Sequence, residues 1–298
     1  MNNRITAGTI GLLAVGVAAV SLAAPLMAQL VVPALAIAFW RNALSAGLIA
    51  PVVAAGRRTE VAALDRGQVI AVLVAGGCLA AHFGFWITSL TMTSVASSTA
   101  IVSLQVIWVV GYEVVRGAPV PRPVILGVAV ATVGAVVVSG VDLSLSGRAL
   151  AGDLLALVGS VAVAAYAVIG GRVRQRMSTA TYTLGVYGAA AVILLVAALV
   201  AGQDLTGYDA EQWAWLVLLA VTAQLLGHSV FNHLLATVTP TVVSLALLLE
   251  IPGAALIAGF WLDQVPGAGA VVGLVLILLG MVLVVRSGPS AEPPTAPA

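Results

Sequence analysis

The chain has 298 residues, of which 61% are hydrophobic and 8% are charged, and its formal net charge is +1. Soluble globular proteins carry about 25% charged residues, so this chain is too poor in charge to cover a surface in water. The composition excludes a soluble globular protein and predicts helices solvated by lipid, since helices satisfy their own backbone polar groups there. The near-neutral net charge gives no reason to expect nucleic acid as a partner. Cys78 is the only cysteine, so the chain cannot form an intrachain disulfide.

Ten apolar runs follow one another, each close to the length of about 20 residues that crosses a bilayer. They are continuous rather than alternating, which favours helices over strands. We predict spans at residues 5–27, 33–55, 68–89, 95–115, 122–140, 150–171, 180–201, 212–234, 240–261 and 266–286. The first run resembles a signal peptide, but nine more runs follow it, so we interpret it as a retained span. Asp153 and Asp209 are predicted to cap helix starts.

The sequence repeats itself at a fixed offset. A shift of 228 − 82 = 146 residues aligns His82 with His228, and the chain contains only three histidines. The same shift aligns Phe85, Thr91, Thr93, Ser98, Ala100, Gly127, Gly134 and Val138 with Phe231, Thr237, Thr239, Ser244, Ala246, Gly273, Gly280 and Val284. This period is too long for a solenoid and predicts two five-helix halves, 1–141 and 142–286. The Pro-rich tail, 287–298, is predicted to be disordered.

The arginines predict the orientation, because the chain has no lysine. With the N-terminus inside, ten arginines fall on the cytoplasmic side, whereas Arg148 falls outside and Arg41 lies in a span. The ten are Arg4, Arg57, Arg58, Arg66, Arg116, Arg122, Arg172, Arg174, Arg176 and Arg286. This asymmetry follows the positive-inside rule and places both termini in the cytoplasm. Five spans per half require the halves to enter the membrane from opposite sides. We therefore predict an all-α integral membrane protein with ten transmembrane helices in two inverted repeats, an arrangement common in secondary transporters.

Two stretches carry a resemblance to a known family. They are AIAFWRNALSAG in the second span and SLALLLEIPGAALIAGFWLDQVPGAGAVVGLVLILLGMVLV at the end of the apolar region. Together with the ten spans, they resemble the drug/metabolite transporter superfamily and, within it, the EamA-type exporters. The resemblance covers residues 5–286 and implies export of small metabolites, amino acids or toxic organic compounds across a bacterial cytoplasmic membrane.

Two charged residues lie inside predicted spans, Arg41 and Glu250. A charge near the bilayer centre is costly, and such a residue is by default a candidate for function. At similar depth the pair would suit a zwitterion, with the Arg41 guanidinium binding a carboxylate and Glu250 an ammonium group. Alternatively the two residues pair with each other or with backbone, or Arg41 extends to the outer headgroups.

The repeated histidines are the next candidates. Residue counting places His82 in the outer half of its span and His228 in the inner half, so we expect one at each gate of an alternating cavity. Histidine titrates near neutral pH, so either could relay protons, although a neutral imidazole bonded between helices is equally consistent. Gln224, His228 and Asn232 follow one helical face, which predicts a polar face turned inward. No carboxylate completes a metal site at this spacing, so no metal is expected.

Four further side chains complete the candidate list. Gln105 lies near mid-depth and is a predicted hydrogen-bond partner for substrate. Trp86 follows His82 by one turn, and Trp40 and Tyr166 are weaker candidates; packing or interfacial anchoring is the alternative for all three aromatic residues. The glycines seven residues apart in the last span of each half, by contrast, predict close helix packing.

Nothing in the sequence indicates an enzyme or a cofactor, since there is no nucleophile elbow, no Gly-rich phosphate loop and no sizeable soluble part. The leading hypothesis is a secondary active exporter of amino acids or similar small metabolites that works by alternating access. The alternatives are efflux of toxic cationic or aromatic compounds and, in a different class, a channel or a non-transporting membrane protein. The expected partners are a small-molecule substrate and the lipid bilayer. The sequence decides neither proton coupling nor a homodimer.

Overall fold

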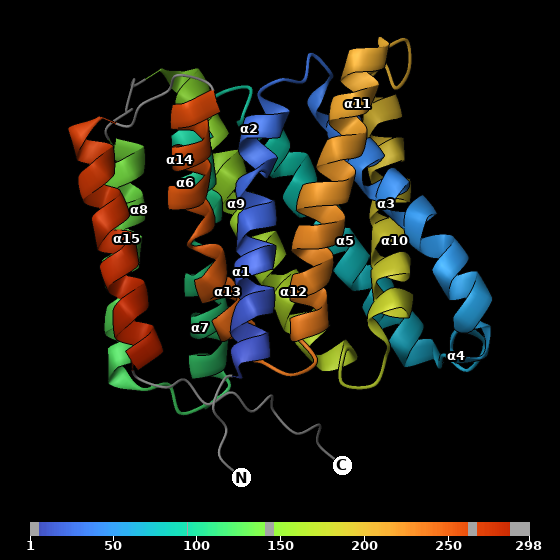
Figure 1. Ribbon diagram of the computed structural model, residues 1–298, viewed down its shortest axis with the longest axis horizontal. Helices are drawn as coiled ribbons and strands as arrows, with labels where there is room; N and C mark the ends of the chain where they lie inside the picture. Colours follow the sequence, from blue (N-terminus) through green and yellow to red (C-terminus); the bar gives the residue numbers. More distant parts are fainter. Residues whose placement is uncertain (1–5, 94, 141–145, 262–266, 287–298) are drawn as a thin grey trace.

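The computed structural model describes residues 6–93, 95–140, 146–261 and 267–286, and over these ranges the chain forms helices and no strands. The helices are α1 Ala7–Ser21, α2 Ala23–Met27, α3 Ala34–Gly56, α4 Arg58–Ala62, α5 Arg66–Ser89, α6 Val95–Val102, α7 Gln105–Val115, α8 Arg122–Gly140, α9 Gly147–Val173, α10 Thr179–Val200, α11 Ala210–Leu219, the π-helix η1 Ala220–His228, α12 Ser229–Leu234, α13 Pro240–Leu247, α14 Glu250–Trp261 and α15 Ala268–Arg286 (Figure 1). The predicted all-α class is confirmed. Arg4 and the predicted disordered tail lie outside the described residues.

Eight helical segments of the described chain are long and apolar enough to cross a membrane. They are Ala7–Met27, Ala34–Gly56, Arg66–Ser89, Ser97–Val115, Gly147–Val173, Thr179–Val200, Ala210–Leu234 and Pro240–Trp261. Two shorter apolar helices, Arg122–Val138 and Ala268–Val284, occupy the positions of the fifth and tenth predicted spans. The inverted relation of the two halves and their boundary stay predictions.

Polar side chains fix where several helices begin. The Asp209 carboxylate accepts the Gln212 N–H at 2.8 Å, so the predicted cap of α11 is confirmed. The same prediction for Asp153 is wrong, because α9 begins earlier, where the Ser146 hydroxyl accepts the Ala149 N–H at 3.2 Å. Asp153 lies inside α9 and accepts a hydrogen bond of 2.9 Å from Ser97 Oγ. It therefore joins α9 to α6 instead of starting a helix.

Two predicted spans are interrupted near their middle. The fourth breaks at residues 103–104, between α6 and α7, and the ninth at residues 248–249, between α13 and α14. In the ninth, Pro252 has no N–H to donate to the carbonyl of Leu248, which removes one helical hydrogen bond. In the fourth, the Ser103 hydroxyl donates to the Thr99 carbonyl at 2.8 Å, a contact that bends helices. The breaks fall at nearly equivalent positions under the 146-residue shift and place backbone ends inside the protein.

The eighth predicted span also departs from a regular helix. Its middle third, Ala220–His228, is a π-helix between α11 and α12. Such segments often occur at functional sites, because the wider turn displaces side chains from their regular positions. Gln224 and His228, two of the polar residues predicted on one face of this span, both lie in η1.

Helices α8 and α15 pack against each other at one edge of the molecule (Figure 1). The contact depends on the glycines predicted for it. A Cβ atom at Gly127 would lie 2.5 Å from the Gly280 carbonyl oxygen, and one at Gly134 would lie 2.6 Å from that of Gly273. The reverse contacts from Gly273 and Gly280 are equally short, at 2.6 and 2.4 Å. The two backbones therefore touch where no other residue fits.

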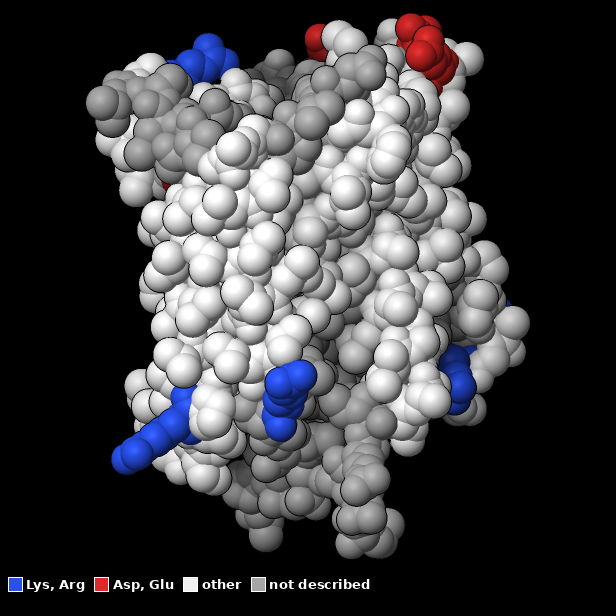
Figure 2. Space-filling model, turned by 60° about the vertical axis from the view of Figure 1, so that its left-hand side comes forward, with Lys and Arg blue, Asp and Glu red and all other residues white. Residues whose placement is uncertain are grey.

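The remaining helices form the body of the molecule beside this edge pair (Figure 1). One apolar cluster fills the space among α2, α3, α5, α9, α10 and α11, and another lies among α6, α7, α8, α13 and α15. A third joins α1, α12 and α13. On the face in Figure 2, basic side chains gather mainly at the lower end and acidic side chains at the upper end, with uncharged residues between. This distribution is the one expected for a protein that crosses a bilayer.

Candidate functional site

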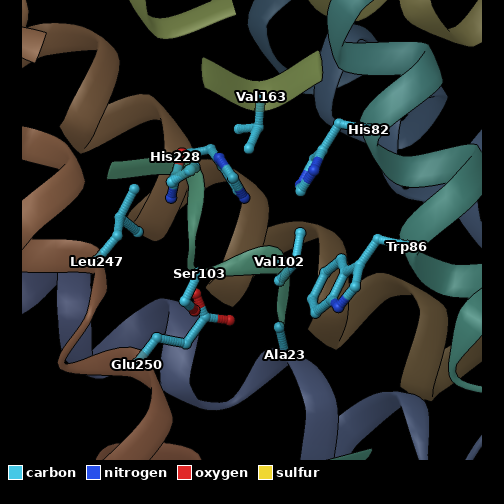
Figure 3. A pocket seen from close by; sticks show the side chains of 10 residues that line it. Ala23, His82, Trp86, Val102, Ser103, Val163, His228, Leu247 and Glu250 are labelled. Atoms are coloured by element: carbon cyan, nitrogen blue, oxygen red, sulfur yellow. The ribbon is translucent and has the colours of Figure 1, made fainter. Parts of the chain in front are cut away.

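A narrow cavity lies where the first and third of these apolar clusters meet. Its walls come from α2, α5, α6, α7, α9, η1, α13 and α14 and from the break between α6 and α7. The lining residues are Ala23, His82, Trp86, Val102, Ser103, Gln105, Val163, His228, Leu247 and Glu250. Figure 3 shows both histidines, Trp86 and Glu250 around one space. The cavity thus combines an acidic group, two imidazoles, an amide, a hydroxyl and apolar surface.

Aromatic rings and histidines form one side of this cavity. The His82 ring stacks on Trp86 with centroids 5.6 Å apart and an interplanar angle of 13°. His82 Nδ1 lies 3.1 Å from the Gly159 carbonyl oxygen. Because a carbonyl only accepts, Nδ1 carries the hydrogen, which leaves Nε2 as the nitrogen that can accept a proton. The indole Nε1 of Trp86 is buried and has no hydrogen-bond partner among the described residues.

The two histidines do not occupy separate gates, so that prediction is wrong. Their ring centroids are 6.4 Å apart, and both rings line the same cavity. Residue counting assumed upright helices centred at one depth, whereas the helices are tilted and displaced relative to one another (Figure 1). His82 and His228 therefore form one titratable pair.

The two helix breaks, between α6 and α7 and between α13 and α14, supply polar groups to the other side of the cavity. Gln105 is the first residue of α7 and Glu250 the first residue of α14, and both line the cavity. The first turn of a helix presents unpaired N–H groups and a partial positive charge. Gln105 is 6% exposed, and its Oε1 has no hydrogen-bond partner among the described residues. The breaks therefore bring polar groups to mid-protein depth without exposing them to lipid.

Arg41 does not line the cavity and lies behind its wall. The residue is 0% exposed, which rules out the alternative that its side chain reaches the headgroups. Its Nε donates to Gln224 Oε1 at 2.9 Å, and its Cζ lies 3.9 Å from the centre of the Phe83 ring. Neither Nη atom has a hydrogen-bond partner within the described residues, so no direct hydrogen bond joins Arg41 to Glu250.

Tyr166 and Asn232 lie outside the cavity lining and bond to each other. The Tyr166 hydroxyl donates to Asn232 Oδ1, and Arg174 Nε donates to the Asn232 carbonyl at 2.8 Å. They follow the lining residues Val163 and His228 by one helical turn. The polar stripe predicted for the eighth span thus divides, with Gln224 at Arg41, His228 in the cavity and Asn232 beyond it.

Trp40 also lies away from the cavity. Its Nε1 donates to the Leu205 carbonyl at 2.8 Å, and its ring packs edge-on against Trp213 with centroids 4.8 Å apart. These contacts join α3 to α11 and to the loop before it, so Trp40 has the packing role that was the alternative to substrate contact.

The sequence analysis missed the lining residue Ser103 and also Phe83, which lies behind the cavity wall. Ser103 is 2% exposed and lies at the helix break, and Phe83 joins Arg41 to His228, whose ring packs edge-on against it at 5.3 Å. A single serine or phenylalanine in an apolar run does not by itself predict a functional residue. The position of Ser103, two residues before the candidate Gln105, could have indicated it. In the part of the chain that the structure describes, no three His, Cys, Asp or Glu side chains come together as a metal site.

Comparisons with known proteins agree with this architecture. A solved structure titled "Crystal structure of protein" superposes with a TM-score of 0.77 at 14% identity and covers 93% of this chain and 97% of its own. At this identity the likeness shows the fold alone. No curated protein matches the chain. The EamA-like transporter family matches residues 150–286, which run from α9 to the end of α15. Over these residues the chain resembles the EamA-like family of the drug/metabolite transporter superfamily, and its apolar helices are those of a multi-pass membrane protein.

Proposed function

We propose that the chain is a secondary active transporter that exports amino acids or similar small amine-bearing metabolites across the bacterial cytoplasmic membrane by alternating access. The observation that carries this proposal is Glu250, a carboxylate in an internal cavity at a helix break. Discontinuous helices with cavity-lining ends are typical of secondary transporter binding sites. A substrate ammonium group would form a charge-assisted hydrogen bond with Glu250 in a medium of low dielectric constant.

The other lining groups fit a small organic molecule. Trp86 and the stacked His82 ring offer a flat apolar wall, and a cation or an aromatic side chain would bind against it. Ser103 and the Oε1 atom of Gln105 offer hydrogen-bond acceptors to the same space. The His82 and His228 pair is a candidate site for proton coupling, because a neutral imidazole has one ring nitrogen that can accept a proton.

A second candidate function is efflux of organic cations. It is favoured by one observation, the absence of Arg41 from the cavity lining, which leaves Glu250 as the acidic residue of a lining that also includes Trp86. A reconstituted-liposome counterflow assay with amino acids in one panel and quaternary ammonium compounds in another separates the two. Saturable counterflow of the amino-acid panel supports the first function, and counterflow of the quaternary panel alone supports the second. Flux without counterflow would contradict both and indicate a channel.

We also propose that both termini lie in the cytoplasm and that the ten apolar helices form two inverted five-helix repeats. The start of α1 and the end of α15 lie at the same end of the molecule, toward which the basic side chains gather (Figures 1 and 2). A Thr206→Cys variant in a Cys78→Ala background tests the orientation, because residue 206 lies in an exposed loop at the opposite end. An impermeant thiol reagent should label it in intact cells. Labelling that requires lysis would reverse the orientation.

A further inference from the structure

Arg41 is a buried cation that makes no hydrogen bond to an anionic group among the described residues. Its side chain is fully buried, and both Nη atoms have no hydrogen-bond partner among the described residues. Burying a guanidinium group without a counterion is strongly unfavourable, so an arginine in this position normally has an anionic partner. Glu250 is close enough to act on the charge of Arg41, but it makes no hydrogen bond to either Nη atom.

The surroundings of Arg41 hold the guanidinium group in one orientation. Gln224 accepts from Nε, and its own Nε2 donates to Asn42 Oδ1 at 3.1 Å. The Asn42 Nδ2 donates in turn to the Ala38 carbonyl at 2.8 Å. The Phe83 ring covers one face of the guanidinium group at 3.9 Å. The edge that carries the two Nη atoms makes no hydrogen bond among the described residues, and such an edge can form paired hydrogen bonds with a planar anion.

The guanidinium group is one aromatic ring away from the cavity. Phe83 contacts Arg41 on one side and the His228 ring on the other, with ring centroids 5.3 Å apart. His228 lines the cavity opposite Glu250 (Figure 3).

We infer that Arg41 is a binding site for one small monovalent anion, a carboxylate or a halide ion. The main source of this anion is the carboxylate of the transported molecule, and this part of the inference rests on the proposed function. The substrate would then be a zwitterion with its amine at Glu250. A free halide ion is the second source of the same chemistry. In both cases Arg41 and Gln224 form the anion subsite, and Phe83 and His228 separate it from the cation subsite.

The experiment compares ligands that differ only in the carboxylate. Thermal unfolding of the purified full-length protein is followed with L-phenylalanine against phenethylamine and with L-leucine against isoamylamine. Chloride is titrated separately, with sodium isethionate keeping the ionic strength constant. A carboxylate site predicts that a zwitterion binds at least tenfold more tightly than its amine. A halide site instead predicts stabilisation by chloride and no advantage for the zwitterion.

Two variants assign the effect to Arg41. Arg41→Gln should remove the advantage of the zwitterion, or the effect of chloride, while binding of the amine remains. Gln224→Glu places a carboxylate beside Nε and should also abolish anion binding without leaving the charge unpaired, so it serves if Arg41→Gln does not fold. Arg174→Gln is the matched control: Arg174 is 6% exposed, and its Nε and Nη2 are already bonded to Asn232 and Thr179. Its anion response should match that of the wild type.

The outcomes separate this inference from the proposed function. If the wild type exchanges amines in liposomes but shows neither a zwitterion advantage nor a chloride effect, the transporter stands and the anion site is wrong. If anions stabilise the wild type through Arg41 but no amine or amino acid is exchanged, the anion site stands and the proposed export function is wrong. An anion effect that is unchanged in both Arg41→Gln and Gln224→Glu would also overturn the site.

Discussion

The central cavity and the α8/α15 pair are built in opposite ways. Around the cavity two spans are broken and one contains a π-helix. The Nε1 atom of Trp86 and the Oε1 atom of Gln105 are buried without hydrogen-bond partners among the described residues. At the α8/α15 contact, both helices are regular, and glycines bring the backbones together with no space for one added carbon atom. Both regions carry positions that match under the 146-residue shift, namely the histidines and the glycines.

This difference indicates that the α8/α15 contact serves stability and that the cavity serves function. A close-packed contact of backbone on backbone maximises dispersion between helices that have no hydrophobic driving force in lipid. Unsatisfied polar groups reduce stability, and they persist where a ligand or a second conformation needs them. We therefore expect substitutions at the cavity to change transport more than folding, and substitutions at the glycines to do the reverse.

The largest effect on transport is expected from Glu250→Gln. The amide keeps the volume of the carboxylate and removes the charge that would bind an ammonium group, so counterflow should fall at least a hundredfold. Because Arg41 makes no hydrogen bond to Glu250, the substitution breaks no hydrogen-bonded ion pair, and the free energy of unfolding should change by less than about 1 kcal/mol. Counterflow and thermal unfolding of the same preparation measure the two quantities.

A structural role for Glu250 gives a different result. If Glu250 stabilises the charge of Arg41, Glu250→Gln should lower the free energy of unfolding by about 3 to 5 kcal/mol, and Arg41→Gln in the same molecule should restore part of it. A stable variant that transports at the wild-type rate would exclude both roles.

The opposite pattern is expected from Gly134→Ala. The new Cβ atom would lie 2.6 Å from the Gly273 carbonyl oxygen and 2.8 Å from the Ile277 nitrogen, so α8 and α15 must separate. Overpacking of this kind costs about 1–3 kcal/mol. Thermal unfolding should show the loss, and transport per folded molecule should stay unchanged.

Gly188→Ala is the matched control for this substitution. Gly188 lies in α10, and a Cβ atom there meets nothing within 4 Å. Alanine favours a helix by about 0.5–1 kcal/mol over glycine, so this variant should be as stable as the wild type or more stable. Equal destabilisation by both substitutions would contradict the importance of the glycine contact.

A smaller effect is expected from Gln105→Leu, which removes a buried polar group that has no partner for its Oε1. The free energy of unfolding should stay unchanged or rise by about 1 kcal/mol, because an unsatisfied buried group is unfavourable. Transport should fall about tenfold. Gln203→Leu serves as the control, because Gln203 Oε1 accepts the Leu35 N–H at 3.0 Å. That variant should lose stability and keep its transport, and a loss of transport in both would show that Gln105 has no special role.

The smallest effect concerns Glu60 in the loop helix α4, outside both regions and outside the membrane spans. Partial burial raises the pKa of Glu60, but hydrogen bonds from Ser178 and Thr181 and the nearby Arg57 outweigh it, and the pKa lies below its usual value. The Ser178 N–H donates to Glu60 Oε1 at 2.6 Å, which joins α4 to the start of α10. A depressed pKa stabilises the fold above the unfolded pKa of about 4.3, and that stability is lost as the pH falls through the folded pKa.

The Glu60→Gln variant isolates this contribution. It should be less stable than the wild type by up to about 1 kcal/mol at pH 7, because the carboxylate is partly exposed. The difference should shrink below pH 4 in thermal unfolding. A difference that is constant from pH 7 to pH 3.5 would contradict the role of the charged carboxylate.

The sequence was sufficient to predict the helices and their approximate bounds, because long apolar runs between Gly and Pro residues have few alternatives to a helix in lipid. It also predicted the glycine contact, since seven-residue spacing in both halves marks one face of a helix. It identified five of the cavity residues, His82, Trp86, Gln105, His228 and Glu250, through rare polar or aromatic residues in apolar runs.

The remaining features depend on tertiary packing. The positions of Arg41, Tyr166 and Asn232 outside the cavity follow from which neighbour each helix face meets, and residue counting along single helices carries no such information. The breaks near Ser103 and Leu248 had local signals, a serine that bonds back to the backbone and a following proline. The π-helix at Gln224 has no signal that a single sequence reveals.

The most direct test of the central claim is chemical modification inside the cavity. Ser103→Cys in a Cys78→Ala background places a thiol at the helix break on the cavity wall. In proteoliposomes, methanethiosulfonate ethylammonium should stop counterflow, and a saturating transported substrate should slow the modification. Gly111→Cys is the control, because it lies exposed on α7 and meets nothing within 4 Å, and its modification should leave counterflow unchanged. Complete modification at residue 103 with unchanged counterflow would contradict the claim that this cavity carries the substrate.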